Sequence, residues 1–242
     1  SLDSAIIHFN AGKSRVQLID TAGDPDFRGQ TLSAMSTVET AAIVISTVAG
    51  IEMSTRRLMR RARQRRLCRM MIINRIDAAD VDLEMLVREI REEFGPACLP
   101  INLPAENFTT VRDCFFHEDG ETDILSLAAA HSEILDQVVE VDEDLMAKYL
   151  ESEKIAPEEL HEAFEKALRE GHLVPICFTS ASTGAGCGEL LRFIEKLLPS
   201  PKEGNPPRFR SGGEDEKVTA NPDPDAHTLA HVFKIVNDPY AG

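Results

Sequence analysis

Short apolar segments rich in valine and isoleucine alternate with amphipathic helical segments along this chain of 242 residues, and this alternation constrains the fold more than any other feature. A buried strand forms a continuous apolar run, whereas a surface helix repeats apolar residues every three or four positions. Strands that are joined by helices favour a mostly parallel sheet with helices on its faces. The sequence therefore predicts an α/β fold, with buried strands at residues 16–19, 42–46, 70–74 and 174–179.

Two segments carry the helical pattern most clearly. Residues 82–94 place their apolar side chains on one face before Gly95-Pro96 ends the helix. These side chains are Leu83, Leu86, Val87, Ile90 and Phe94. Residues 189–198 repeat the pattern before a proline. The side chains predicted to face inward there are Leu190, Leu191, Ile194, Leu197 and Leu198.

The middle of the chain has a different character. Residues 96–173 are acidic, with a predicted hairpin around Asp119-Gly120 and predicted helices at 142–151 and 157–170. We interpret this segment as an α+β subdomain, packed as a separate lobe. The predicted core of the main domain is then made of residues 1–95 and 174–199.

The last part of the chain is predicted to leave this domain. Residues 200–226 are rich in proline, glycine and acidic residues, a composition typical of a linker. Residues 229–236 alternate apolar and polar side chains like a single strand. Because one strand cannot fold alone, we expect residues 227–242 to begin a further β domain.

Composition narrows the class of protein. Apolar residues make up 43% of the chain and charged residues 28%, which excludes wholesale disorder. The longest uninterrupted apolar run, residues 41–45, is too short to cross a membrane. The five cysteines contain no Cys-x-x-Cys pair, which is typical of reduced thiols. We therefore expect a cytoplasmic protein.

Charge is spread unevenly over the chain, whose net charge is −15. Residues 1–80 carry a net charge of +4, and residues 81–242 carry −19. Eight of the twelve basic residues in segment 1–80 lie in one predicted helix and the residues that follow it. Its arginines are Arg56, Arg57, Arg60, Arg61, Arg63, Arg65, Arg66 and Arg69. Two interpretations stay open, namely contact with the phosphates of a polyanion and a solvated helix face.

A first polar motif, Asp20-Thr21-Ala22-Gly23, follows a predicted strand and precedes a helical pattern. Asp20 is therefore expected at the carboxyl edge of a sheet, where open α/β proteins bind ligands. A carboxylate there can hold Mg²⁺ through water, and the backbone N–H of Gly23 can approach a terminal phosphate because no side chain intervenes. The alternative is an ordinary turn from strand to helix.

Two further motifs, Asn74-Arg75-Ile76-Asp77 and Ser180-Ala181, follow two other predicted strands. A carboxylate such as Asp77 can accept the ring N–H and the exocyclic amine of guanine, a pair of donors that adenine lacks. Backbone N–H groups at Ser180-Ala181 can donate to the guanine carbonyl oxygen. Each residue also has a structural interpretation in a turn, cap or loop. The order of the three motifs, all at strand ends, favours a guanine nucleotide site.

In this order the motifs resemble those of translation elongation factor G, and especially a divergent, elongation-factor-G-like branch of that family. Residues 16–27 resemble the family's Asp-Thr-Pro-Gly-His-x-Asp-Phe segment, residues 74–77 its Asn-Lys-x-Asp motif, and Ser180-Ala181 its guanine-carbonyl loop. Residues 198–201 resemble the exit from the GTPase domain, and residues 232–239 the first strand of the β-barrel domain that follows.

The resemblance covers nearly the whole chain and implies both a fold and a function. The implied fold is a P-loop-NTPase-like GTPase domain with an α+β insert, and the implied function is GTP hydrolysis coupled to translocation or a related step on the ribosome. The nucleotide-binding residues that it implies are Asp20, Gly23, Asn74, Arg75, Asp77, Ser180 and Ala181, with Asp20 also holding Mg²⁺ through water. The implied ligands are GTP or GDP with Mg²⁺. The implied partners are ribosomal RNA and large-subunit stalk proteins, without DNA or a membrane.

A first departure from the family concerns the phosphates. The sequence contains no Gly-x-x-x-x-Gly-Lys-Ser/Thr motif, the loop that holds phosphates through its N–H groups and lysine. Residues 11–14 read Ala-Gly-Lys-Ser, but residues 10–13 are better interpreted as the turn of a hairpin that joins residues 5–9 to 15–19. We therefore expect the chain to begin inside a GTPase domain, after its phosphate loop, and to be inactive by itself.

The second departure is Asp24, which stands where the family has the histidine that orients the attacking water. Asp24 is therefore a candidate catalytic residue, but local chemistry favours a helix cap. Asp24 as N-cap, Pro25 as the first helical residue and Asp26 in the first turn predict a helix start before Phe27. The alternative function is consequently a GTPase-derived module that binds the ribosome or a protein, with vestigial hydrolysis. Arg75 in place of lysine is a milder change.

Overall fold

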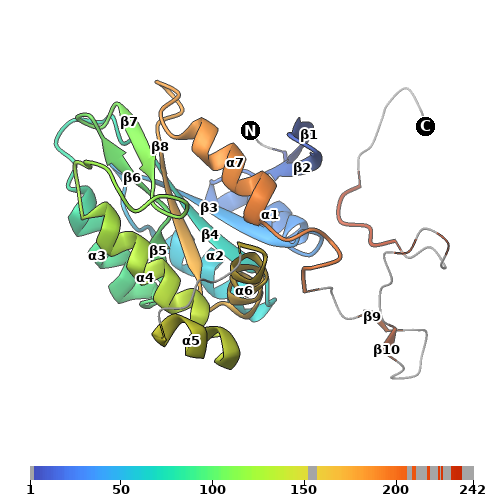
Figure 1. The fold of residues 1–242 in the computed structure, drawn as a ribbon. Coiled ribbons are helices and arrows are strands. Elements are labelled where there is room, and N and C mark those ends of the chain that lie inside the picture. The colour runs from blue at the N-terminus through green and yellow to red at the C-terminus, as the bar shows by residue number, and fades with distance from the viewer. Residues whose placement is uncertain are drawn as a thin grey trace.

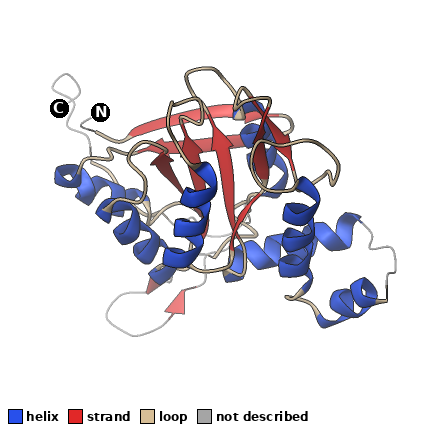
Figure 2. Ribbon diagram, turned by 90° about the vertical axis from the view of Figure 1, so that its left-hand side faces the viewer, coloured by secondary structure: helices blue, strands red, loops and turns tan. Residues whose placement is uncertain are grey.

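The computed structural model describes residues 3–151, 157–205, 209–210, 217–218, 223, 225 and 230–235. Four parallel strands form its central sheet, in the order β3-β4-β8-β5. Their bounds are β3 Thr40–Ser46, β4 Cys68–Asn74, β5 Cys98–Pro100 and β8 Val174–Thr179. Helices lie on both sides of this sheet (Figures 1 and 2). The predicted α/β fold with a parallel sheet is therefore confirmed.

Seven α-helices and one short 3-10 turn lie in the described part of the chain. They are η1 Pro25–Phe27, α1 Arg28–Ala34, α2 Met53–Gln64, α3 Leu83–Phe94, α4 Leu127–Val139, α5 Glu143–Leu150, α6 Pro157–Glu170 and α7 Cys187–Leu197. None of the helices in these described ranges is both long and apolar enough to cross a bilayer.

The two helices predicted most clearly are present. Helix α3 begins after Asp82, whose carboxylate accepts the Met85 N–H at 2.8 Å, and ends at Gly95 with φ +110°. In α7 the prediction of the inward face is wrong in part, because Leu191 is 44% exposed while Phe193 is buried. The buried residues Phe193 and Leu197 lie one turn apart on the face that meets the sheet.

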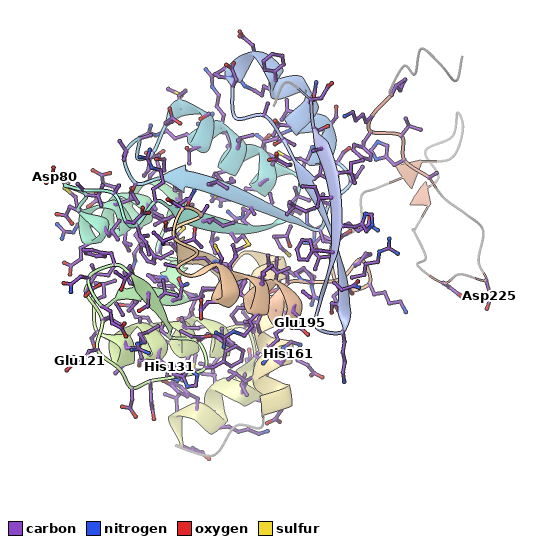
Figure 3. The ribbon with its side chains drawn as sticks, turned by 90° about the horizontal axis from the view of Figure 1, so that it is seen from above. Asp80, Glu121, His131, His161, Glu195 and Asp225 are labelled. Carbon is purple, nitrogen blue, oxygen red and sulfur yellow. The ribbon has the colours of Figure 1, made fainter. Side chains whose placement is uncertain are left out.

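Strands β1 (Ala5–Ala11) and β2 (Ser14–Asp20) form the predicted hairpin, with Ala11 opposite Ser14. Gly12 takes φ +53° in the two-residue turn, and the Lys13 N–H donates to Glu195 Oε1 of α7 at 3.2 Å (Figure 3). The expectation that residues 16–19 form a buried strand is wrong, because the hairpin is a two-stranded sheet of its own. The residues of β2 are therefore exposed or half-buried.

The segment 96–173 contains a hairpin, but at a different place from the one predicted. It joins β6 (Asn102–Ala105) to β7 (Thr110–Asp113), and residues 106–108 of its turn all have positive φ. The Asp123 carboxylate accepts the N–H groups of Asn107 and Phe108 at 3.1 and 2.6 Å. This turn is thus stabilised by a side chain that is distant in sequence. Local turn propensity, which predicted the hairpin at Asp119-Gly120, does not detect such a contact.

The same segment shares its hydrophobic core with the sheet instead of packing as a separate lobe. Its strand β5 pairs with β8, and one continuous cluster of buried residues extends from β3 and β4 through α3, α4 and α6 to α7. The rings of Phe115, Phe164 and Phe193 illustrate the continuity, with successive centroids 4.6 and 6.1 Å apart. Helices α5 and α6 match the predicted helical stretches, whereas α4 was not predicted.

Most of the predicted linker, residues 200–226, lies outside the described residues. Its beginning is fixed to the domain, because Asn205 Nδ2 donates to the carbonyl oxygens of Arg66 and Arg169 at 2.7 and 2.9 Å. Short strands β9 (Phe209–Arg210) and β10 (Lys217–Val218) pair with each other. Residues 230–235 have no regular secondary structure, so the strand predicted at 229–236 is not formed in its described part. A further β domain stays a prediction.

The buried amide of Asn102 provides a test of how β8 is held. Its Nδ2 donates to the Phe178 carbonyl at 3.2 Å, and its Oδ1 accepts the Phe178 N–H at 2.7 Å. We expect Asn102→Ala to lower the free energy of unfolding by about 2–4 kcal/mol, because both backbone groups lose their partner in the core. Urea denaturation measures this change. The control Asn10→Ala removes an exposed asparagine of β1 and should change stability by less than ~0.5 kcal/mol. Equal effects of the two substitutions would contradict the prediction.

Candidate functional site

Two sequence motifs that lie far apart in the chain meet at the carboxyl edge of the sheet. In the parallel pairing of β4 with β8, Asn74 stands opposite Thr179, the last residue of its strand. The Asn74 side chain then reaches the next loop, where its Oδ1 accepts the Ala181 N–H at 3.0 Å. The structure therefore joins the Asn-x-x-Asp motif directly to the Ser-Ala motif, as their positions at strand ends predicted.

The turn after β4 exposes two of the predicted site residues. Ile76 is fully buried and its N–H donates to the Thr179 carbonyl at 3.2 Å. Arg75 and Asp77, on either side of it, are exposed, and Arg75 has φ +71°. The Thr47 hydroxyl donates to the Arg75 carbonyl at 2.8 Å. With its backbone held in this way, the turn leaves the Asp77 carboxylate exposed to solvent, one residue after the Ile76 N–H that bonds to the end of β8.

The Ser180-Ala181 loop differs from the expectation in one respect. Ser180 is fully buried, its N–H donates to the Ala185 carbonyl at 2.8 Å, and its hydroxyl accepts the Thr183 N–H at 3.2 Å. The Ala181 N–H is already bonded to Asn74. Neither N–H is open to a ligand, because a loop this close to the core satisfies its own donors. A carbonyl oxygen that enters here must share or take over the Ala181 N–H.

The remaining site residues lie at the end of the hairpin. Asp20 is exposed at the last position of β2, and a Cβ added to Gly23 would meet no atom within 4 Å. Asp24 is the N-cap of η1, with Oδ1 accepting the Asp26 N–H at 2.9 Å and Pro25 at the first position. The predicted cap is thus confirmed. Because β2 belongs to a different sheet from β4 and β8, strand pairing does not fix Asp20 beside Asn74.

Comparison with known proteins decides the family. The model of the elongation factor Tu GTP binding domain matches residues 1–200. The chain belongs to this family of translational GTPases. An elongation factor G-like protein of Thermotoga maritima is 31% identical over 241 residues, which cover 94% of this chain and 35% of the relative. A crystal structure of a protein from Thermus thermophilus superposes with a TM-score of 0.74 at 29% identity, covering 84% of this chain and 33% of the other.

These comparisons confirm the resemblance to elongation factor G and the GTPase-domain fold. They also show that the chain spans about a third of the length of each relative. Membership of the elongation factor Tu family implies guanine nucleotide binding, usually with Mg²⁺, in the intact protein.

The described residues fit the guanine half of such a nucleotide better than the phosphate half. Asp77, three residues after Asn74, is an exposed carboxylate, which suits the two donors of guanine, and the Asn74 side chain contacts the Ala181 loop. At residues 11–14, by contrast, the turn packs on a carboxylate, since a Cβ on Gly12 would lie 1.6 Å from Glu195 Oε1. A phosphate cannot occupy a turn that already faces a side-chain anion.

Two positioning residues of the site were missed from the sequence. Thr47 follows β3, and its hydroxyl donates a hydrogen bond to the Arg75 carbonyl. Nothing in the sequence distinguishes it from other polar residues in turns. Gly186 has φ +73°, and a Cβ there would lie 2.2 Å from the Phe178 carbonyl oxygen. Its only sequence signal is its place between two predicted elements, close to Gly184 and Gly188.

The two glycines at the start of α7 form a matched pair for testing this loop. We expect Gly186→Ala to destabilise the domain by at least ~1–2 kcal/mol, because alanine disfavours the left-handed backbone and meets the Phe178 carbonyl. Gly188 lies inside α7 with open space around it, so Gly188→Ala should stabilise by ~0.5–1 kcal/mol. Chemical denaturation of both variants checks the signs, and a tolerated alanine at 186 would refute the assigned role.

Proposed function

We propose that the protein to which this chain belongs binds GTP with Mg²⁺ and hydrolyses it in a step of translation on the ribosome. The observation that carries the proposal is the contact of Asn74 Oδ1 with the Ala181 N–H at 3.0 Å, in the motif that ends with the exposed Asp77. It supports a base-binding edge at the carboxyl ends of β4 and β8, the place where open α/β sheets bind ligands.

The proposed recognition follows from hydrogen-bonding chemistry. Asp77 accepts the ring N–H and exocyclic amine of guanine, while Ala181 and Ser180 form the loop that meets the carbonyl oxygen. The aliphatic part of the Arg75 side chain lies along the base, and the Asn74 side chain positions the Ser180-Ala181 loop. Adenine lacks the pair of donors that Asp77 accepts, so the edge is selective for guanine.

The phosphates require more than this chain's described residues offer. Asp20 would hold Mg²⁺ through water, and the Gly23 N–H would meet the terminal phosphate, where no protein atom lies within 4 Å of an added Cβ. Without a phosphate-binding loop, Asp20 presents negative charge to the phosphates. We therefore expect this 242-residue chain to bind GDP no more tightly than about 0.1 mM and to show no GTP hydrolysis.

A second candidate function is a GTPase-derived binding module with vestigial hydrolysis. It is favoured by Asp24, whose carboxylate caps η1 at the position where the family has a histidine. GTP turnover by the full-length protein, with and without ribosomes, separates the two functions. Stimulation by ribosomes supports the first, and no turnover in either condition supports the second. Contacts with ribosomal RNA and the large-subunit stalk proteins, and a cytoplasmic location, belong to the first proposal.

Base selectivity is tested by Asp77→Asn. The amide cannot accept two hydrogen bonds from guanine as the carboxylate does, so GDP affinity should fall roughly tenfold or more, in line with ~1.5–3 kcal/mol for a charged hydrogen bond. Chemical-shift titration of this chain with GDP and ADP measures weak binding directly. The control Asp80→Asn lies three residues further along the same exposed loop (Figure 3) and should leave affinity unchanged. Binding of ADP as well as GDP by the unmodified chain would count against a guanine site.

The role of position 24 is tested in the full-length protein. Asp24→His should raise GTP hydrolysis, within the ~10²–10⁴-fold range of a positioned acid-base group, because imidazole removes a negative charge near the terminal phosphate. Asp24→Asn is the matched control, since it removes the same charge and keeps a side-chain cap on η1 but supplies no base; its rate therefore measures the effect of the charge alone. Single-turnover rates compare the three proteins. A rate for Asp24→His at or below that of the unmodified protein would mean that Asp24 itself contributes to hydrolysis in this protein.

A further inference from the structure

Helix α2 and the turn after it carry a dense positive charge on an otherwise acidic chain. Residues 53–76 contain nine arginines and no aspartate, glutamate or lysine. Because the net charge of the whole chain is −15, the remaining residues carry −24. Residues 53–76 are therefore a segment in which positive charge is concentrated and no acidic residue balances it.

The arginines form a strip that faces away from the sheet. Helix α2 buries Thr55, Met59 and Ala62. The exposed residues of the segment 57–66 are only arginine and glutamine. They are Arg57, Arg60, Arg63, Gln64 and Arg66. We call these four exposed arginines the arginine strip.

A solvated helix face does not account for this strip. Arginines repeat at spacing i, i+4 in three pairs, 56/60, 57/61 and 61/65, and like charges at this spacing repel. Partial burial, and then the cation of Arg61, lower the pKa of Arg65. Within the described residues, the run from 56 to 69 has one salt bridge, between Arg56 and Glu93 at 3.0 Å. A surface shaped only for solubility would alternate acidic and basic residues.

The chemistry of the strip indicates its partner. Planar guanidinium groups match phosphate oxygens in paired hydrogen bonds, which makes arginine suited to phosphate recognition. Residues 53–76 contain no aromatic side chain, so the strip offers no platform for stacking single-stranded bases. Residues 57–66 also expose no apolar anchor of the kind that a protein interface needs.

We propose that the arginine strip binds the phosphate backbone of a folded RNA, without reading its sequence. The strip is separate from the loops of the nucleotide site, because α2 begins after the carboxyl end of β3 and runs towards the amino end of β4, so Arg60, Arg63 and Arg66 lie successively further from the edge that holds Asn74. The choice of RNA among polyphosphates rests on the proposed function, whereas the phosphate chemistry rests on the strip itself.

Binding of a fluorescent RNA hairpin of about 20 base pairs, followed by anisotropy over a salt series, tests the proposal. The variant Arg57→Gln/Arg60→Gln/Arg63→Gln removes three charges of the strip. We expect it to weaken binding tenfold or more and to reduce the slope of log affinity against log salt by roughly 2–3, since each lost phosphate contact removes about 0.9. The single variant Arg60→Gln should show a smaller loss in the same direction.

The control Arg15→Gln/Arg88→Gln/Arg192→Gln lowers the net charge equally on other elements and should keep at least half of the affinity. Melting temperatures should be unchanged or raised in the strip variant, because two of the repulsive pairs are removed. GDP titration of both variants should match the unmodified chain, which separates a failure here from a failure of the nucleotide site.

Three results would overturn the proposal. They are no binding by the unmodified chain at 50 mM salt, an equal loss in the control, and equal affinity for polyglutamate of the same charge. Equal affinity for duplex DNA would overturn the assignment to RNA.

Discussion

The parallel pairing of β4 with β8 is the constraint on which the candidate site depends. It places Asn74 opposite Thr179, so the loops that follow both strands leave the sheet side by side. A shift of one residue would turn every side chain of a strand to the other face and separate the Asn74 side chain from Ala181. The register is held by apolar packing along the strands, where Met71, Ile73 and Ile176 are fully buried. The contact between Asn74 and Ala181 at the edge of the sheet therefore depends on the apolar packing that holds the strand register in the core.

Two close approaches to Phe178 hold the end of β8 that carries the Ser180 loop. The Asn102 amide bonds both backbone groups of Phe178, and Gly186 passes so near its carbonyl that no side chain fits. The outward face of α2, which runs away from this edge, concentrates the arginines. The domain therefore separates a rigid polar edge, built by hydrogen bonds, from a charged face on a helix.

The sequence predicted the elements that local pattern determines. The parallel strands β3, β4 and β8, α3 with its Asp82 cap, the Asp24 cap and the hairpin around Gly12 all follow from periodicity or turn chemistry, whereas the short strand β5 was not predicted. The sequence-based predictions were wrong where the local structure depends on residues that are distant in the chain. The turn at 106–108 depends on Asp123, the exposure of β2 depends on which strands it pairs with, and the engaged Ala181 N–H depends on Asn74. None of these partners is near in sequence.

The shared core of the segment 96–173 has a consequence for cooperativity. Phe115 in this segment meets Phe164 of α6, which meets Phe193 of α7, and β5 supplies an edge strand of the sheet. Loosening of either part exposes apolar surface of the other, so we expect the two to melt together in one transition. Excision of residues 96–173 would accordingly leave β8 with an unpaired edge and α7 without its aromatic neighbours.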